Sequence, residues 1–253
     1  MLTSVRSLTA ASVFALSAAF AAPAMAQDGE IGVEVSANVA MVSEYRFRGV
    51  DLSGGEFAIQ GGVDVGLPAG FYVGTWASSL DEQTVGYGST ELDVYGGWAG
   101  EFGNISTDVG VIMYIYPDAG PGDFDYVEFY GSVGVGVGPG DLTVGVAYAP
   151  KQDSLCCDAM LDNMDNFYIY ADAGVGIPET PLSLSAHVGY TDGFLTYTED
   201  SEAIDWSVGL SLALPSTPLE LGVAYIGVEG DATVDPGFVF TDDAVVVTLS
   251  ASI

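Results

Sequence analysis

Apolar and polar residues alternate along most of this chain, and the stretch from Asn38 to Gly62 shows the pattern first. Its odd-numbered positions are mostly apolar, namely Val39, Met41, Tyr45 and Phe47. Its even-numbered positions are mostly polar, namely Asn38, Glu44, Arg46 and Arg48. A repeat of two residues is the signature of a β-strand with one apolar and one polar face.

Twelve segments with this repeat follow one another along the chain, and none has the periodicity of an amphipathic helix. They lie near residues 32–48, 56–67, 71–80, 90–99, 104–116, 126–137, 142–149, 166–177, 182–191, 204–214, 219–228 and 244–253. The pattern therefore predicts an all-β chain of about twelve strands.

The connections between these segments alternate in length. Tight turns rich in glycine or proline lie at residues 68–70, 100–103, 138–141, 178–181 and 215–218. Longer and mostly acidic connections lie at residues 49–55, 81–89, 117–125, 150–165, 191–203 and 229–243. This alternation, with an even number of strands, is typical of a transmembrane antiparallel up-and-down β-barrel with short periplasmic turns and longer extracellular loops. Both ends of the barrel are then expected on the periplasmic side.

Aromatic residues on the apolar faces fall into two groups under this topology. The group near the long loops contains Tyr45, Phe47, Phe57, Phe129, Tyr148, Phe167, Tyr190, Trp206 and Tyr225. The group near the short turns contains Phe71, Trp98 and Phe102. Two such girdles are expected where a barrel crosses the two lipid–water interfaces. A soluble β-sandwich would also alternate, but it gives no reason to sort the aromatic residues in this way.

Residues 1–26 fit a secretory signal peptide, and residues 27–253 form the predicted barrel domain. Arg6 precedes an apolar run from Ala10 to Ala22, and Ala24-Met25-Ala26 satisfies the small-residue rule for cleavage. A secreted barrel is expected in the bacterial outer membrane, with the membrane lipid in contact with its apolar faces.

The chain is strongly acidic, with 4 Lys and Arg against 35 Asp and Glu and a formal net charge of −31 at pH 7. Beyond the leader the basic residues are Arg46, Arg48 and Lys151. Nucleic acid is excluded as a partner, because binding it requires a basic surface. The only cysteines, Cys156 and Cys157, are adjacent in a polar connection, where we interpret them as two free thiols or one strained bridge without function.

The residues around Tyr45-Arg46-Phe47-Arg48-Gly49 and Gln60-Gly61-Gly62 carry a family resemblance, which Gly70-Phe71-Tyr72-Val73-Gly74 and the segment from Asp93 to Gly97 continue. In these motifs the chain resembles the TorF family of porin-like proteins from proteobacteria. The resemblance implies an outer-membrane barrel with a channel function. The chain departs from common barrel proteins in ending on Ile253 instead of an aromatic residue.

If the apolar faces contact lipid, the polar faces line the lumen, where carboxylates far outnumber basic side chains. The residues we expect at a pore constriction are Arg46, Arg48, Glu44, Glu56, Asp93, Glu128, Asp172 and Asp205. Rings of carboxylates in a pore select cations, so the sequence predicts passive diffusion of small hydrophilic, preferentially cationic solutes. The same arginines could instead form salt bridges that only brace the wall. The alternative function is an occluded barrel with a structural or surface-binding role.

A second lumen-facing set is aromatic and contains Tyr114, Tyr116, Tyr126, Tyr130, Tyr168 and Tyr170. It could present rings and hydroxyls to a solute, or it could simply fill the upper lumen. Lumen-facing glycines such as Gly74, Gly110 and Gly189 favour an open path, because they lack side chains.

No enzymatic or cofactor motif is present. His187 is the sole histidine, and the sequence has no catalytic elbow and no metal-spaced His or Cys set. We therefore predict no catalytic residues, no bound metal within the barrel and no cofactor. Clustered carboxylates in the long loops could attract divalent cations. The sequence leaves the oligomeric state open.

Overall fold

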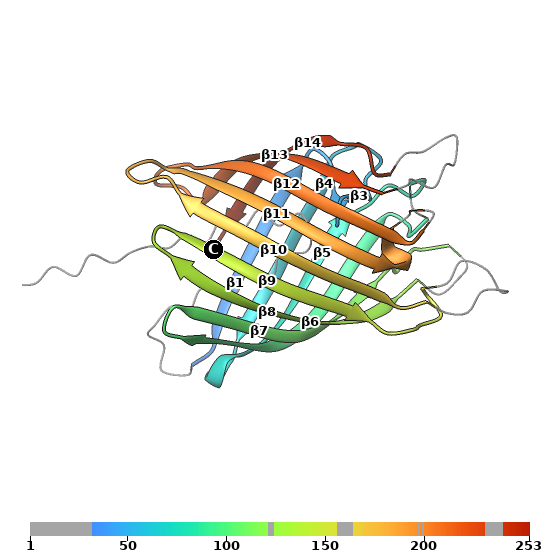
Figure 1. The fold of residues 1–253 in the computed structure, drawn as a ribbon, viewed down its shortest axis with the longest axis horizontal. Helices are drawn as coiled ribbons and strands as arrows, with labels where there is room; N and C mark the ends of the chain where they lie inside the picture. The colour runs from blue at the N-terminus through green and yellow to red at the C-terminus, as the bar shows by residue number, and fades with distance from the viewer. Residues whose placement is uncertain are drawn as a thin grey trace, which may run out of the picture.

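The computed structural model describes residues 32–84, 86–120, 124–155, 164–196, 198, 200–230 and 240–253. The predicted signal peptide and Cys156 and Cys157 lie outside these residues. Within them the chain forms a closed antiparallel barrel of twelve strands, as predicted (Figure 1). Among the described residues, no helix reaches the length and hydrophobicity that crossing a membrane requires.

Each barrel strand pairs with its neighbours in sequence, and the first pairs with the last. The barrel strands are β1 (Glu34–Val42), β4 (Ala58–Gly66), β5 (Phe71–Ser79), β6 (Thr90–Phe102), β7 (Ile105–Ile115), β8 (Tyr126–Val137), β9 (Gly140–Ala149), β10 (Asn166–Gly176), β11 (Leu182–Gly193), β12 (Glu202–Ala213), β13 (Leu219–Glu229) and β14 (Ala244–Ser252). Short 3-10 turns occupy Pro68–Gly70 and Phe194–Thr196. The pairing of Asn38 with Ser252 through Val42 with Thr248 closes the barrel.

The short and long connections lie at opposite ends of the barrel, as predicted (Figure 1). The C-terminal strand ends beside β1, where the backbone amide of Ile253 donates to the carbonyl of Ala37 at 3.0 Å. Both ends of the described barrel therefore lie on the short-turn side, because Glu34 pairs with Gly66 next to the first short turn.

The two faces of each strand differ sharply in exposure. On β4, Ile59 is 66% exposed while the neighbouring Ala58 is 0% exposed, and on β6 Val94 is 50% exposed while Asp93 is 0% exposed. Apolar side chains therefore cover the outside of the barrel, and polar and aromatic side chains fill its inside. An apolar outer surface of this kind is the expected solution when the solvent around a barrel is lipid.

The first predicted strand is too long. The alternation predicted a strand over residues 32–48, with Tyr45 and Phe47 facing lipid, but β1 ends at Val42. Tyr45 and Phe47 are 3% and 6% exposed, so they lie inside the barrel. A buried position in a lumen and a position against lipid both favour apolar side chains, so alternation alone does not distinguish them.

Candidate functional site

Residues 43–57, which we call the inward segment, leave the barrel wall after β1 and return to it at β4. Every residue from Tyr45 to Ser53 is buried. The segment contains its own two-stranded hairpin, formed by β2 (Arg46–Phe47) and β3 (Val50–Asp51). This hairpin fills part of the lumen.

The tip of the hairpin is a two-residue turn with positive φ at both positions, 50° for Arg48 and 81° for Gly49. Positive φ at both positions is the mark of the type I′ hairpin turn, in which Asn, Asp and Gly are preferred. Arginine is an unfavourable choice for that backbone conformation. Its presence places a guanidinium at the tip of the hairpin, where Arg48 is 6% exposed.

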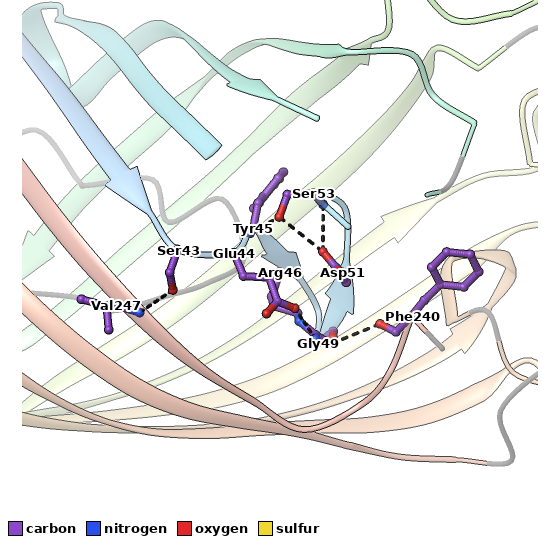
Figure 2. A network of polar contacts seen from close by, with 9 residues as sticks. All are labelled: Ser43, Glu44, Tyr45, Arg46, Gly49, Asp51, Ser53, Phe240 and Val247. Atoms are coloured by element: carbon purple, nitrogen blue, oxygen red, sulfur yellow. Dashed lines mark hydrogen bonds and ion pairs between the residues drawn. The ribbon is translucent and has the colours of Figure 1, made fainter. Parts of the chain in front are cut away.

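Backbone contacts fasten the inward segment to distant parts of the chain. The amide of Ser43 donates to the carbonyl of Val247 at 2.8 Å, and the amide of Val247 donates to the Ser43 hydroxyl at 2.9 Å. The amide of Asp51 donates to the carbonyl of Phe240 at 2.8 Å. Figure 2 shows Ser43 beside Val247 on one side of the segment and Phe240 beside the hairpin at Gly49 on the other. The inward segment is thus held from the β14 side as well as from its own ends.

Arg46 is buried and serves the hairpin itself. Its Nη1 donates to the carbonyl of Gly49 at 2.9 Å and to the carbonyl of Phe240 at 3.2 Å, and its Nη2 forms an ion pair with Glu44 (Figure 2). Burial raises the pKa of the Glu44 carboxyl, while the neighbouring Arg46 acts in the opposite direction. The contacts of Arg46 shape the turn and link it to Phe240.

Arg48 crosses the lumen to the wall. Its Nη2 donates to Oε2 of Glu128 on β8 at 2.6 Å, and Arg48 and Glu128 are 6% and 2% exposed. The guanidinium lies 4.3 Å from the ring centre of Tyr168 on β10 and 4.7 Å from that of Phe47. A buried pair of this kind is strongly destabilised when one partner is removed, because the other charge is left buried and unpaired.

The inward segment contacts much of the barrel circumference. Tyr45 donates to Oε1 of Glu91 on β6 at 3.1 Å and packs against Trp76 on β5. Phe47 packs edge-on against Tyr114 on β7. At the tip, a Cβ on Gly49 would come within 2.1 Å of Val228 on β13, so only glycine fits there. Contacts from β5 around to β13 mean that the segment spans the lumen instead of lining one side.

A second charged cluster joins β10, β11 and β12. His187 Nδ1 lies 2.6 Å from Oδ1 of Asp172, and Nε2 lies 2.8 Å from Oδ2 of Asp205. The hydroxyl of Tyr168 is 2.8 Å from the same Nε2 and donates to Oδ2 of Asp205 at 3.2 Å. Because Tyr168 also lies under Arg48, this cluster and the Arg48–Glu128 pair are neighbours.

Most of the predicted constriction residues form ion pairs in the structure. Arg46 pairs with Glu44, and Arg48 pairs with Glu128. Asp172 and Asp205 both contact His187, which lies between them. Asp93 is fully buried, and neither oxygen of its carboxylate has a hydrogen-bond partner among the described residues. Glu56 is exposed and follows the buried stretch from Tyr45 to Ser53, so the structure does not bring it together with the other predicted constriction residues.

The predicted tyrosine cluster divides into four groups. Tyr114 and Tyr126 stack at 4.4 Å, and Tyr168 and Tyr170 stack at 5.5 Å. The hydroxyl of Tyr130 lies 2.5 Å from that of Tyr72. Tyr116 instead packs on Tyr87, with ring centres 4.5 Å apart.

The lumen glycines do not leave the open space that the sequence suggested. A Cβ on Gly189 would lie 2.2 Å from the hydroxyl oxygen of Tyr168, and a Cβ on Gly110 would lie 2.3 Å from that of Tyr130. A Cβ on Gly74 would likewise lie 2.4 Å from the ring of Tyr95. At these positions a tyrosine from a nearby strand occupies the space that a side chain would take. The glycines therefore allow tyrosines to fill the lumen.

A small cavity remains where the hairpin tip meets the His187 cluster. It has room for about one water molecule. Its lining residues are Arg48, Gly49, His187, Asp205, Trp206, Ser207 and Ile226. Within the described part of the chain, no group of three or more His, Cys, Asp or Glu residues is arranged to hold a metal ion.

Sequence reasoning missed the contributions of Tyr45, Phe47 and His187 to this site. The alternation places the tyrosine and the phenylalanine on the lipid face, and the sequence motifs give His187 no role. The cross-strand pair of Asp172 with His187 could have been found from the strand bounds, because it follows from the register of β10 and β11.

Comparisons with known proteins agree with this fold. Residues 26–253 match the model of a family described as "Bacterial protein of unknown function (Gcw_chp)". No curated protein matches the chain. The match does not name the TorF family, so that resemblance stays a prediction.

Solved structures of porins are similar to this chain in fold. A NanC porin superposes with a TM-score of 0.60 at 8% sequence identity, covering 86% of this chain and 99% of that porin. A KdgM porin superposes with a TM-score of 0.53 at 12% identity, covering 86% of this chain and 97% of that porin. At such low identity the likeness establishes a shared fold.

Proposed function

This chain belongs to the bacterial family of unknown function (Gcw_chp), and from its geometry we propose that it is a porin-like outer-membrane channel for passive diffusion of small hydrophilic solutes. Support comes from the closed twelve-stranded barrel, its apolar outer surface and its polar interior. Porins share this fold. The apolar surface would contact outer-membrane lipid.

The observation that carries the proposal is the inward segment with Arg48 at its tip. A barrel of twelve strands is wider than the filled eight-stranded barrels and narrower than the open sixteen-stranded porins. A channel past a hairpin across such a lumen would be narrow and would admit only small solutes. The bonded Arg48–Glu128 pair then fixes the position of the restriction.

Charge supports a preference for cations. Around the restriction, the three carboxylates of Glu128, Asp172 and Asp205 outnumber the two basic side chains that they contact, Arg48 and His187. A carboxylate excess along a pore attracts cations and repels anions. We propose that the channel prefers cations for this reason.

Selectivity is measured on the purified, refolded full chain in planar bilayers under a potassium chloride gradient. We expect a reversal potential of the sign that marks K⁺ as the more permeant ion, with a smaller magnitude at high salt because salt screens the lumen charges. A reversal potential that marks Cl⁻ as more permeant would contradict the proposed preference.

A second candidate is an occluded barrel with a structural or surface-binding role. The buried hairpin and the tyrosines that occupy the space beside Gly74, Gly110 and Gly189 favour it. In that case the wild-type chain would show no conductance steps and no uptake of small solutes into liposomes. The same recordings therefore separate the two candidates.

We propose no catalytic role. Ser207 lies opposite His187 in the pairing of β11 with β12, but both ring nitrogens of His187 already face carboxylates. The imidazole is therefore not available as a base for the Ser207 hydroxyl.

A further inference from the structure

His187 is held between two carboxylates from opposite sides of its strand. Asp172 on β10 is its direct cross-strand partner, and Asp205 on β12 lies diagonal to it. The two contacts use different ring nitrogens, with distances of 2.6 Å at Nδ1 and 2.8 Å at Nε2. The side chains of His187 and Asp205 are 9% and 6% exposed, so water screens these contacts poorly.

The geometry constrains how many protons the ring carries. An ionised carboxylate only accepts hydrogen bonds, and a neutral imidazole has one N–H group. A neutral ring would therefore point one lone pair at a carboxylate oxygen. The Tyr168 hydroxyl could donate to that nitrogen instead, but Oδ2 of Asp205 would still lie 2.8 Å from the same lone pair. The doubly protonated ring donates to both carboxylates and removes this conflict.

We propose that His187 is an imidazolium at neutral pH, and that this third lumen cation, with Arg46 and Arg48, sets the ion selectivity of the pore. The selectivity part rests on the proposed channel function. The charged and titratable groups that face the ring are Asp172, Tyr168 and Tyr170 from β10, Asp205 from β12 and Arg48 across the small cavity.

Negative and positive side chains alternate along a line through the lumen. Glu128 is followed by Arg48, then by Asp205, His187 and Asp172, so negative and positive charges follow each other from β8 to β10. Loss of the ring proton in alkaline solution makes the lumen one unit more negative. The cation preference of the pore must then increase as pH rises, because its carboxylate excess grows.

The first test measures the protonation state of the His187 ring. His187 is the only histidine of the chain, so ¹⁵N-histidine labelling of the refolded, untagged full chain gives signals from one ring. An ordinary histidine, with a pKa of about 6.5, is almost fully neutral at about pH 8. We expect the two ring nitrogens of the wild type to show imidazolium shifts at about pH 8. Shifts of a neutral ring at that pH would overturn the proposal.

Two variants test whether Asp172 itself keeps the His187 ring protonated, or whether the loss of any lumen carboxylate has the same effect. Asp172→Asn keeps an acceptor opposite Nδ1 but removes the negative charge, so the ring becomes neutral at about pH 8. The control is Asp108→Asn, because Asp108 bonds to Tyr72 and not to His187. It should leave the imidazolium signals unchanged. An equal change of the ring-nitrogen signals in both variants would contradict a specific effect of Asp172 on His187.

The second test reads selectivity. The cation preference of the wild type should rise between about pH 7 and about pH 10, whereas His187→Gln should start from a higher preference and show a smaller rise. The same pH step in His187→Gln would overturn the selectivity role. If no barrel conducts, the proposed channel function fails and the selectivity role fails with it, while the ring spectrum still decides the charge of His187.

Discussion

Replacing the inward segment with a short loop is expected to raise the single-channel conductance several-fold. Val42 and Ala58 are paired at the ends of β1 and β4, so a four-residue glycine-rich loop can join the two strands directly. The replacement removes the hairpin that contacts the wall from β5 around to β13. Planar-bilayer recording of the refolded wild type and the shortened barrel gives the comparison.

The control for this experiment is Glu56→Gln, which changes an exposed carboxylate in the same segment and leaves the hairpin in place. Its conductance should match that of the wild type. A shortened barrel that folds but conducts no better than the wild type would show that the restriction lies elsewhere in the lumen.

Glu128→Gln is expected to release the inward segment from its position. The change leaves the buried guanidinium of Arg48 without its ion-pair partner, which costs about 3–5 kcal/mol for pairs of this kind. Trypsin reports the release cleanly, because the chain has only four basic residues and two of them, Arg46 and Arg48, lie in the hairpin. We expect cleavage after Arg46 and Arg48 in the folded variant, identified by mass spectrometry.

Two further variants show whether the cleavage results from the loss of the ion pair. Glu56→Gln, an equal loss of one carboxylate in an exposed position, should stay uncut in the hairpin. Arg48→Asn combined with Glu128→Gln removes both charges and places a residue that tolerates positive φ at the turn. It should resist cleavage at Arg46 better than Glu128→Gln alone. Protection of the hairpin in Glu128→Gln would mean that the ion pair does not hold it.

Alternation in the sequence was enough to predict the barrel. The segment expected at residues 126–137 is β8 (Tyr126–Val137), and the other barrel strands after the first are displaced by a few residues at most. The reason is physical: a strand between lipid and a polar lumen has two different solvents, so its two faces diverge in composition along its whole length.

The lumen was less predictable because its packing depends on contacts between distant segments. Tyr45 and Phe47 continue the alternation of β1, yet they pack inside against Trp76 and Tyr114. The available signal was local, since Arg48-Gly49 at the end of the alternation predicts a turn better than a strand. The partner of Arg48 could not be read from the sequence, as Glu128 is 80 residues away.

Digestion of the folded wild type with trypsin tests most directly whether the inward segment lies in the lumen. Lys151 is exposed in a connection between β9 and β10, while Arg46 and Arg48 are 4% and 6% exposed inside the barrel. The structure predicts cleavage after Lys151 with the bonds after Arg46 and Arg48 intact, and cleavage at all of these sites once the barrel is unfolded. Cleavage after Arg46 or Arg48 in the folded wild type, at the rate seen at Lys151, would contradict a hairpin inside the lumen.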